Sequence, residues 1–136
     1  MAEFIVKTQM EPWEPKLQNR HIVTFPEIYN IPDWSIKSIN LPTITNTNCG
    51  NIILEIYDPI QPSIKQACME LLVEDKLNDT FELNVVILGS ARDVVEKWQF
   101  TIKEIVSINF GNFDFNKDEP NTMKMELKIL KYEMLF

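Results

Sequence analysis

The residue types that could do chemistry are few in this sequence, and they stand apart from one another. His21 is the single histidine, and the two cysteines, Cys49 and Cys68, lack the Cys-x-x-Cys or His/Cys spacing of a metal site. Ser63 and Ser90 have no neighbouring base in the sequence, and the three glycines lie too far apart to form a phosphate-binding loop. The sequence therefore predicts a protein that is not an enzyme, with no catalytic residue, no cofactor and no bound metal.

The segment from residue 109 to residue 121 holds the nearest approach to a carboxylate cluster and also a group of phenylalanines. The carboxylates lack the glycine and the closing glutamate of an EF-hand loop, so they predict a solvated turn. The phenylalanines could stack on the bases of a single-stranded nucleic acid, but the segment contains no arginine. Packing in the core or at a subunit interface is the favoured interpretation. The residues concerned are Asp114, Asp118 and Glu119, and Phe110, Phe113 and Phe115.

The charge of the chain excludes one broad class of function. The sequence carries 20 Asp and Glu residues against 13 Lys and Arg residues, which gives a formal net charge of −7. Binding to a nucleic-acid backbone requires clustered Lys and Arg that displace counterions. The composition therefore argues against binding to the DNA backbone, although not against a position next to DNA without binding. No apolar run approaches the roughly 18 residues of a transmembrane helix, so no membrane partner is expected.

Alternation of apolar and polar residues predicts the elements that position these groups. Such alternation is typical of strands with one buried face, and the strongest example runs through Trp98, Phe100 and Ile102. A period of 3–4 residues occurs only between residues 61 and 76, where Ile64, Ala67, Cys68, Leu71 and Leu72 share one helical face. The predicted fold is mainly β: an antiparallel β-sandwich or barrel with one flanking α-helix. The predicted strands are 21–25, 34–39, 51–57, 81–88, 94–111 and 121–136.

Two segments offer few internal packing partners. Residues 1–18 predict an N-terminal arm, because Pro12 and Pro15 would interrupt the hydrogen-bond ladder of a β-sheet. The arm precedes a single predicted β-barrel domain at 19–136. Trp13 in this arm packs either on its own domain or on a neighbouring subunit. Residues 40–51 predict an exposed loop or hairpin tip, rich in Asn, Thr, Pro and Gly. The residues expected at contacts between subunits are Trp13, Thr43, Thr45, Asn46 and Asn48.

The order of these segments resembles that of tail tube proteins of contractile-tailed bacteriophages. The resemblance spans most of residues 16–136 and depends on several segments in sequence rather than on one signature. These segments are PKLQNRHIVTFP, WSIKSINLP, ILEIYDPIQPS with the helix that follows it, VVEKWQF, SINFGNFDF and KMELKILKYEML. The arm and the 40–51 loop fit the pattern less well. Four roles within the family therefore remain as alternatives: a main tube subunit, a tube initiator, a hub protein and a terminating protein.

The resemblance implies a structural protein of the virion tail, assembled in the host cytoplasm. Members of this family form hexameric rings that stack into a conduit for DNA, beside sheath, baseplate and neck proteins. DNA would pass through such a conduit without specific binding, and an acidic lining would repel its phosphates. Two alternatives remain: a secretion-system tube or baseplate hub component, and an unrelated small β-sandwich binding module.

Overall fold

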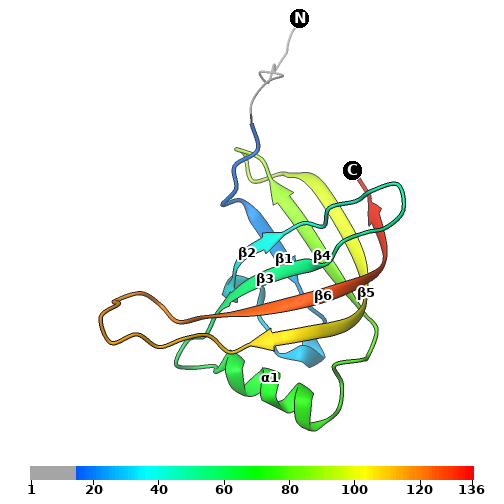
Figure 1. The fold of residues 1–136 in the computed structure, drawn as a ribbon. Coiled ribbons are helices and arrows are strands. Elements are labelled where there is room, and N and C mark those ends of the chain that lie inside the picture. Colours follow the sequence, from blue (N-terminus) through cyan, green and yellow to red (C-terminus); the bar gives the residue numbers. More distant parts are fainter. Residues whose placement is uncertain (1–14) are drawn as a thin grey trace, which may run out of the picture.

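The fold is a strongly curved antiparallel sheet, seen in a computed structural model that describes residues 15–136. Trp13 and most of the predicted arm lie outside these described residues. Within them the six strands follow the order β1-β4-β5-β6-β3-β2 (Figure 1), and the two outer strands, β1 and β2, also contact each other. The sheet thereby forms a nearly closed barrel, as predicted. The strands are β1 (His21–Thr24), β2 (Ile36–Asn40), β3 (Ile52–Tyr57), β4 (Phe81–Leu88), β5 (Val94–Asn109) and β6 (Thr122–Met134).

The predicted alternation places the core side chains inside the barrel. Phe100 and Ile102 of β5 are fully buried. Met123, Met125 and Leu127 of β6 are fully buried as well, and they lie opposite Ile56, Leu54 and Ile52 of β3. Trp98 packs against the same core, its ring 5.5 Å from that of Phe100. The polar residues between these positions point outward, because successive side chains of a strand alternate between its faces.

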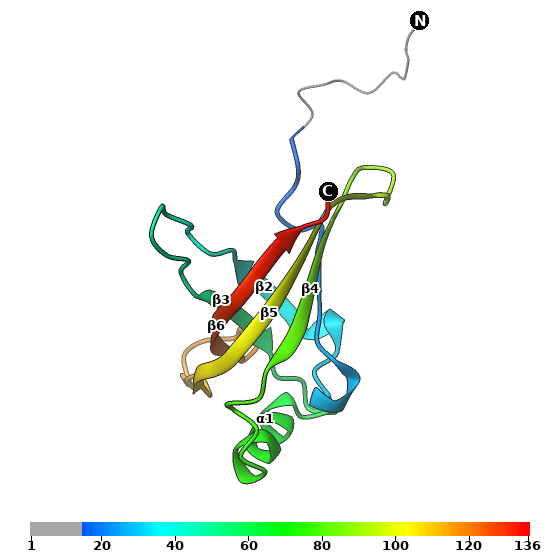
Figure 2. The same ribbon diagram turned by 90° about the vertical axis from the view of Figure 1, so that its right-hand side faces the viewer.

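The helix α1 (Ile64–Val73) lies across one end of the barrel (Figures 1 and 2). Ile64, Cys68 and Leu71 are buried in the core cluster, as the helical period predicts. The prediction for Leu72 is wrong: its side chain is 40% exposed. The helix covers an end of the barrel rather than a broad flank, so only a narrow stripe of its surface touches the core.

The segment before β2 departs from the predicted strand. Residues Asp33–Ser35 form a short 3₁₀ turn, and the strand begins only at Ile36. The side chain of Ser35 is buried and donates a hydrogen bond to the carbonyl oxygen of Pro32 at 2.6 Å, while Trp34 is 60% exposed. The turn shifts the register of side chains by one residue, which places Trp34 outside the barrel.

Candidate assembly surfaces

The loop between β2 and β3 projects from the barrel as an irregular hairpin (Figure 2). The amide of Gly50 donates to the carbonyl of Thr43 at 2.8 Å, and the amide of Thr45 donates to the carbonyl of Asn48 at 2.8 Å. The Thr45 hydroxyl also accepts a hydrogen bond from the Asn48 amide at 3.1 Å, which fixes the tip. Thr43, Thr45, Asn46 and Asn48 are all exposed on this loop. The predicted exposure of the loop is therefore confirmed, and its contacts with another subunit stay a prediction.

The loop between β5 and β6, residues 110–121, carries the most exposed aromatic side chains of the described chain. Phe115 is fully exposed and Phe113 is 81% exposed, whereas Phe110 packs partly against the core. Packing in the core, one of the two predicted alternatives, is therefore wrong for Phe113 and Phe115, while packing at a subunit interface stays a prediction. The reason is that the strands end at Asn109 and Thr122, so the loop extends beyond the barrel wall (Figure 1).

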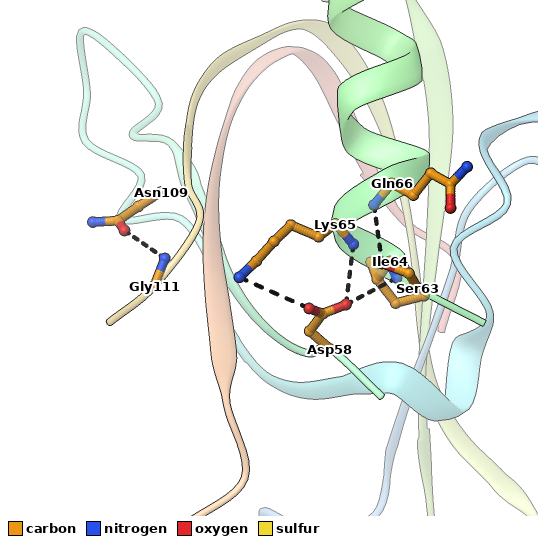
Figure 3. Close-up of polar contacts among 7 residues, drawn as sticks. All are labelled: Asp58, Ser63, Ile64, Lys65, Gln66, Asn109 and Gly111. Carbon is orange, nitrogen blue, oxygen red and sulfur yellow. Dashed lines mark hydrogen bonds and ion pairs between the residues drawn. The ribbon is translucent and has the colours of Figure 1, made fainter. Parts of the chain in front are cut away.

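A tight turn sets the direction in which this loop leaves β5. The backbone amide of Gly111 donates to the side-chain oxygen of Asn109 at 2.9 Å (Figure 3). Gly111 has a φ of 91°, a conformation that favours glycine, and a Cβ atom there would lie 2.2 Å from the carbonyl oxygen of Thr122. The turn therefore requires glycine for both its backbone angle and its close approach to β6.

The start of α1 is fixed by two side chains that lie before it, as Figure 3 shows. Ser63 accepts a hydrogen bond from the Gln66 amide at 3.2 Å, as an N-cap residue does. The Asp58 carboxylate accepts from the amides of Ile64 and Lys65 at 3.0 and 3.1 Å. A negative charge at this position also complements the positive end of the helix dipole. This role of Asp58 was not predicted from the sequence, although an Asp a few residues before a helix is a recognisable signal.

Lys65 connects the helix to the projecting loop. Its Nζ atom lies 3.9 Å from an Asp58 carboxylate oxygen and 4.6 Å from the centre of the Phe113 ring. A cation over an aromatic face at this distance is attracted to the ring. One side of Phe113 is therefore held toward α1, and the other side of the ring and the whole of Phe115 remain open to solvent.

The long strands β5 and β6 leave two edges without a strand partner in the described chain. β4 pairs with β5 only as far as Ile102, so residues 103–109 have no strand on the β4 side. On that side, the Ile105 amide donates a hydrogen bond to the Leu77 carbonyl. β3 pairs with β6 only as far as Leu127, so residues 128–134, which pair with β5 on one side, have no strand on the β3 side within the described chain. The two edges lie on opposite sides of the β5–β6 pair and cannot pair with each other within one barrel.

A buried carboxylate lies at the barrel end away from α1. Glu96 of β5 is almost fully buried, accepts a hydrogen bond from the indole nitrogen of Trp98 and lies 2.5 Å from the Nζ atom of Lys16. Burial raises the pKa of Glu96, but the hydrogen bonds from Lys16 and Trp98 and the charge of Lys16 outweigh burial, so the pKa falls below its ordinary value. This group is not predictable from the sequence, because a Glu within an alternating strand gives no sign of a partner 80 positions away.

The candidate chemical groups remain apart in the structure. His21 Nδ1 lies 2.7 Å from the Gln18 carbonyl at the start of β1, and both cysteines are free thiols. Burial, together with the charge of Asp58, raises the pKa of Cys68 to about 12, so this thiol is poorly suited to act as a nucleophile. Over residues 15–136 no group of three or more His, Cys, Asp or Glu side chains is arranged to hold a metal ion. No helix in the same range is long and apolar enough to cross a membrane.

Comparison with known proteins identifies the fold. No family model matches this sequence, and no curated protein matches it. Solved structures do match, and each of the following comes from a contractile particle. A chain of the sheath/tube terminator of an extracellular contractile injection system (PVC) in the extended state matches with a TM-score of 0.70 and 12% identity, covering 93% of this chain and 100% of that one.

Two further structures give the same result. A chain from the extended sheath-tube complex of the same kind of particle matches with a TM-score of 0.69 and 12% identity, covering 96% of this chain and 98% of that one. A chain from the 6-fold symmetrised baseplate of the anti-feeding prophage matches with a TM-score of 0.62 and 16% identity, covering 90% and 96%. The fold is thus the tube-like barrel found in contractile injection particles, in agreement with the predicted fold class.

Proposed function

We propose that this chain is a structural subunit of a contractile-tail tube, in which copies form rings that stack into a conduit. The observation that supports the proposal most directly is the pair of unpaired strand edges on opposite sides of the β5–β6 pair. Unpaired edges favour pairing with another chain, and two different edges on opposite sides favour a head-to-tail contact. Head-to-tail contacts close into a ring when the rotation between copies allows it.

The two edges also carry apolar side chains that a neighbour would cover. Val106 on the first edge is 45% exposed, and Leu130 and Met134 on the second are 57% and 50% exposed. Tyr132 lies opposite Phe100 on β5 and Met134 lies opposite Trp98, so both side chains continue the apolar face of the barrel beyond the end of β3. Covering such surface contributes roughly 25 cal/mol per Å² of apolar area.

Within the proposal, the ring number and the cargo are inferred from one comparison and from the charge of the chain. One matching particle has a baseplate described with six-fold symmetry, which supports a ring of six for this chain. The net charge of −7 favours a conduit through which DNA passes without specific binding. Within this proposal, sheath and baseplate or neck proteins are the partners, and the assembled virion tail is the location.

A second candidate role is a hub or tube-initiating subunit, or a secretion-system tube subunit. The match to a baseplate chain favours it, since a barrel of this kind is used there as well as in the tube region. The two roles differ in how far stacking continues. A tube subunit forms long stacks from one kind of chain, whereas a hub subunit stops at one or two rings.

Native mass spectrometry and negative-stain images of the concentrated purified protein test the proposal. A mass of six chains and images of rings or tubes are expected. A protein that stays monomeric at high concentration would contradict the ring and would favour the small binding module. A matched variant, Leu130→Lys with Val106→Lys, should keep the melting temperature of the barrel and lose the ring, because both changes place charge on exposed edge positions.

A further inference from the structure

The end of the barrel that α1 covers carries an excess of negative charge. α1 and the turn after it, residues 64–80, lie at this end together with the 3₁₀ turn Glu27–Tyr29, which packs against α1 (Figures 1 and 2). These two segments carry five carboxylates against two lysines, a formal charge of −3. Both lysines already have a partner, since Lys65 pairs with Asp58 and Lys76 pairs with Glu74. The carboxylates are Glu27, Glu70, Glu74, Asp75 and Asp79.

The opposite end of the barrel carries an excess of positive charge. Three segments lie there, far from α1 in both views: residues 15–20, residues 89–97 and residues 135–136 (Figures 1 and 2). They carry four basic residues against two carboxylates, a formal charge of +2. Within the described chain, the one ion pair at this end joins Lys16 to Glu96. The charges left over are those of Arg20, Arg92 and Lys97 against that of Asp93.

Exposed apolar side chains lie among the charges at both ends. On α1, Met69 and Val73 are one turn apart on the face turned away from the barrel, and Val73 is 80% exposed. At the other end Phe136 is 59% exposed, although its backbone carbonyl accepts a hydrogen bond from the Lys97 amide at 3.0 Å. Apolar side chains next to charged ones are typical of the core and rim of protein interfaces. The exposed apolar residues are Ile28, Met69, Leu72 and Val73 at the α1 end, and Leu17, Val94, Leu135 and Phe136 at the other end.

A second copy of this chain is the partner that these two surfaces fit. Opposite net charges attract the α1 end of one copy to the opposite end of another, whereas like ends repel each other. The charges therefore favour a head-to-tail orientation. A contact between two different surfaces is heterologous, so it repeats along an axis instead of closing as a two-fold dimer does. The barrel separates the two ends within one copy, so only another copy can bring them together (Figure 2).

We propose that the α1 end of one copy docks head-to-tail on the opposite end of a copy in the next ring. The apolar side chains of the two ends pack together, and the carboxylates of the α1 end face Arg20, Arg92 and Lys97. This inference rests on the proposed tube function and names the contact that stacks one ring on the next. The contact within a ring uses the strand edges at 103–109 and 128–134, so the two contacts are made by different residues.

Charge reversal at each end tests this contact, because two reversals in one chain restore complementary ends. One variant reverses the positive end, Arg92→Asp with Lys97→Glu, and a second reverses the α1 end, Glu70→Lys with Glu74→Lys. Each should raise the protein concentration needed for stacking at least about tenfold while single rings still form, as sedimentation and negative-stain images measure. A third variant carries all four changes, so its ends carry −2 and +1 in place of +2 and −3. It should recover most of the lost stacking.

A matched control changes the net charge equally at positions away from the positive end. Lys117→Glu with Lys124→Glu makes the chain more negative by four charges, as the Arg92 and Lys97 changes do. Both lysines are exposed, one on the 110–121 loop and the other on β6, and this control should stack as the unmodified protein does. Added salt should weaken the stacking of the unmodified protein, because it screens the attraction between the ends.

Substitution of an apolar residue provides a second measurement that leaves the charges unchanged. Val73→Ser should raise the concentration needed for stacking about fivefold, because less apolar surface is covered in the contact. Ile53→Thr, which changes an apolar residue with 40% exposure on β3, should leave stacking unchanged. Equal stacking of the Val73→Ser variant and the unmodified protein would contradict the packing of α1 on the next copy.

The outcomes separate this inference from the proposed function. A four-residue variant that stacks no better than the two-residue variants would overturn the proposed contact while single rings still form. A control that loses stacking as the Arg92 and Lys97 variant does would also overturn it, because net charge alone would then explain the loss. An unmodified chain that forms no rings at all would overturn both this inference and the ring. Thermal melting of each variant checks that the barrel is folded, which is expected because none of the changed side chains is buried.

Discussion

Lys16 and Glu96 are 80 positions apart in the sequence, yet their side chains form an ion pair with an N–O distance of 2.5 Å at one end of the barrel. Lys16 belongs to the segment that precedes β1, and Glu96 points into the barrel from β5. The pair therefore fixes the chain where it leaves the described domain toward its N-terminus. Lys16 remains about half exposed, so the contribution of the pair is modest.

The pair predicts a pH dependence of stability. Because the pKa of Glu96 is lowered in the folded state, its contribution is present above the unfolded value near 4.5 and is lost as the pH falls through the folded value. Glu96→Gln should lower the free energy of unfolding by about 0.5–1 kcal/mol at pH 7. Chemical denaturation at pH 7 and below pH 4 measures this, and the difference from the unmodified protein should shrink at the lower pH. An equal difference at both pH values would show that the charge of Glu96 is not responsible.

The helix packing predicts a contrast between adjacent leucines. Leu71 is 5% exposed and Leu72 is 40% exposed. Leu71→Ala should therefore lower the free energy of unfolding by about 2–5 kcal/mol, while Leu72→Ala should cost less than about 1 kcal/mol. Thermal and urea unfolding of the two variants measure the contrast. Equal melting temperatures would mean that α1 does not close the barrel end.

The cap formed by Asp58 predicts a local effect on α1. Asp58→Asn keeps an oxygen that can accept from the Ile64 and Lys65 amides but removes the charge, whereas Asp58→Ala removes both. Loss of the cap should cost about 0.5–2 kcal/mol for the alanine variant and less for the asparagine variant. Hydrogen exchange of the first turn of α1 measures this effect residue by residue. Unchanged protection in Asp58→Ala would contradict the assigned cap.

The predicted arm can be removed to test its role in assembly. Deletion of residues 1–15 should leave a folded barrel, because the described core contains no residue before Val23. We expect the truncated chain to lose polymerisation, which sedimentation and electron microscopy measure, since the arm is predicted to contact a neighbouring subunit. A truncated chain that fails to fold would instead place the arm in the core of its own domain.

The proposed conduit predicts an absence of DNA binding. A ring of six copies, each with a formal charge of −7, would carry about −42, and we expect its lumen to be richer in Asp and Glu than in Lys and Arg. Fluorescence anisotropy with double-stranded DNA at physiological salt should therefore detect no binding. Micromolar binding that weakens with added salt, or a lumen lined mainly by lysine and arginine, would overturn this interpretation.

The strands and the helix could be predicted from the sequence because each has one buried face. Alternation through Phe100 and Ile102, and the helical period through Ile64 and Cys68, both follow from contact with a single core. The prediction failed for Trp34, where a local turn shifts the side chains, and for Leu72, where the helix touches the barrel only at its end. Both errors concern the limits of an element rather than its existence.

The surfaces proposed for assembly were harder to predict. The lengths of β5 and β6 were visible in the sequence, but the unpaired edges depend on where β3 and β4 end against them. Such registers are set by long-range pairing, which local patterns do not contain. The same holds for Lys65 and Phe113, since a lysine on a helix gives no sign of the aromatic ring that it meets in a distant loop.

The strand order has a consequence for when this protein can assemble. β6 is synthesised after the other five strands, yet it lies between β5 and β3 in the sheet. Until it emerges from the ribosome, the β2–β3 pair and the β1–β4–β5 group are separate pieces with no shared ladder. In the proposed ring, a nascent chain would still lack the β6 edge, so joining of copies is expected only after Met134 has been synthesised. The position of β6 in the sheet would thus keep incomplete chains out of the proposed ring.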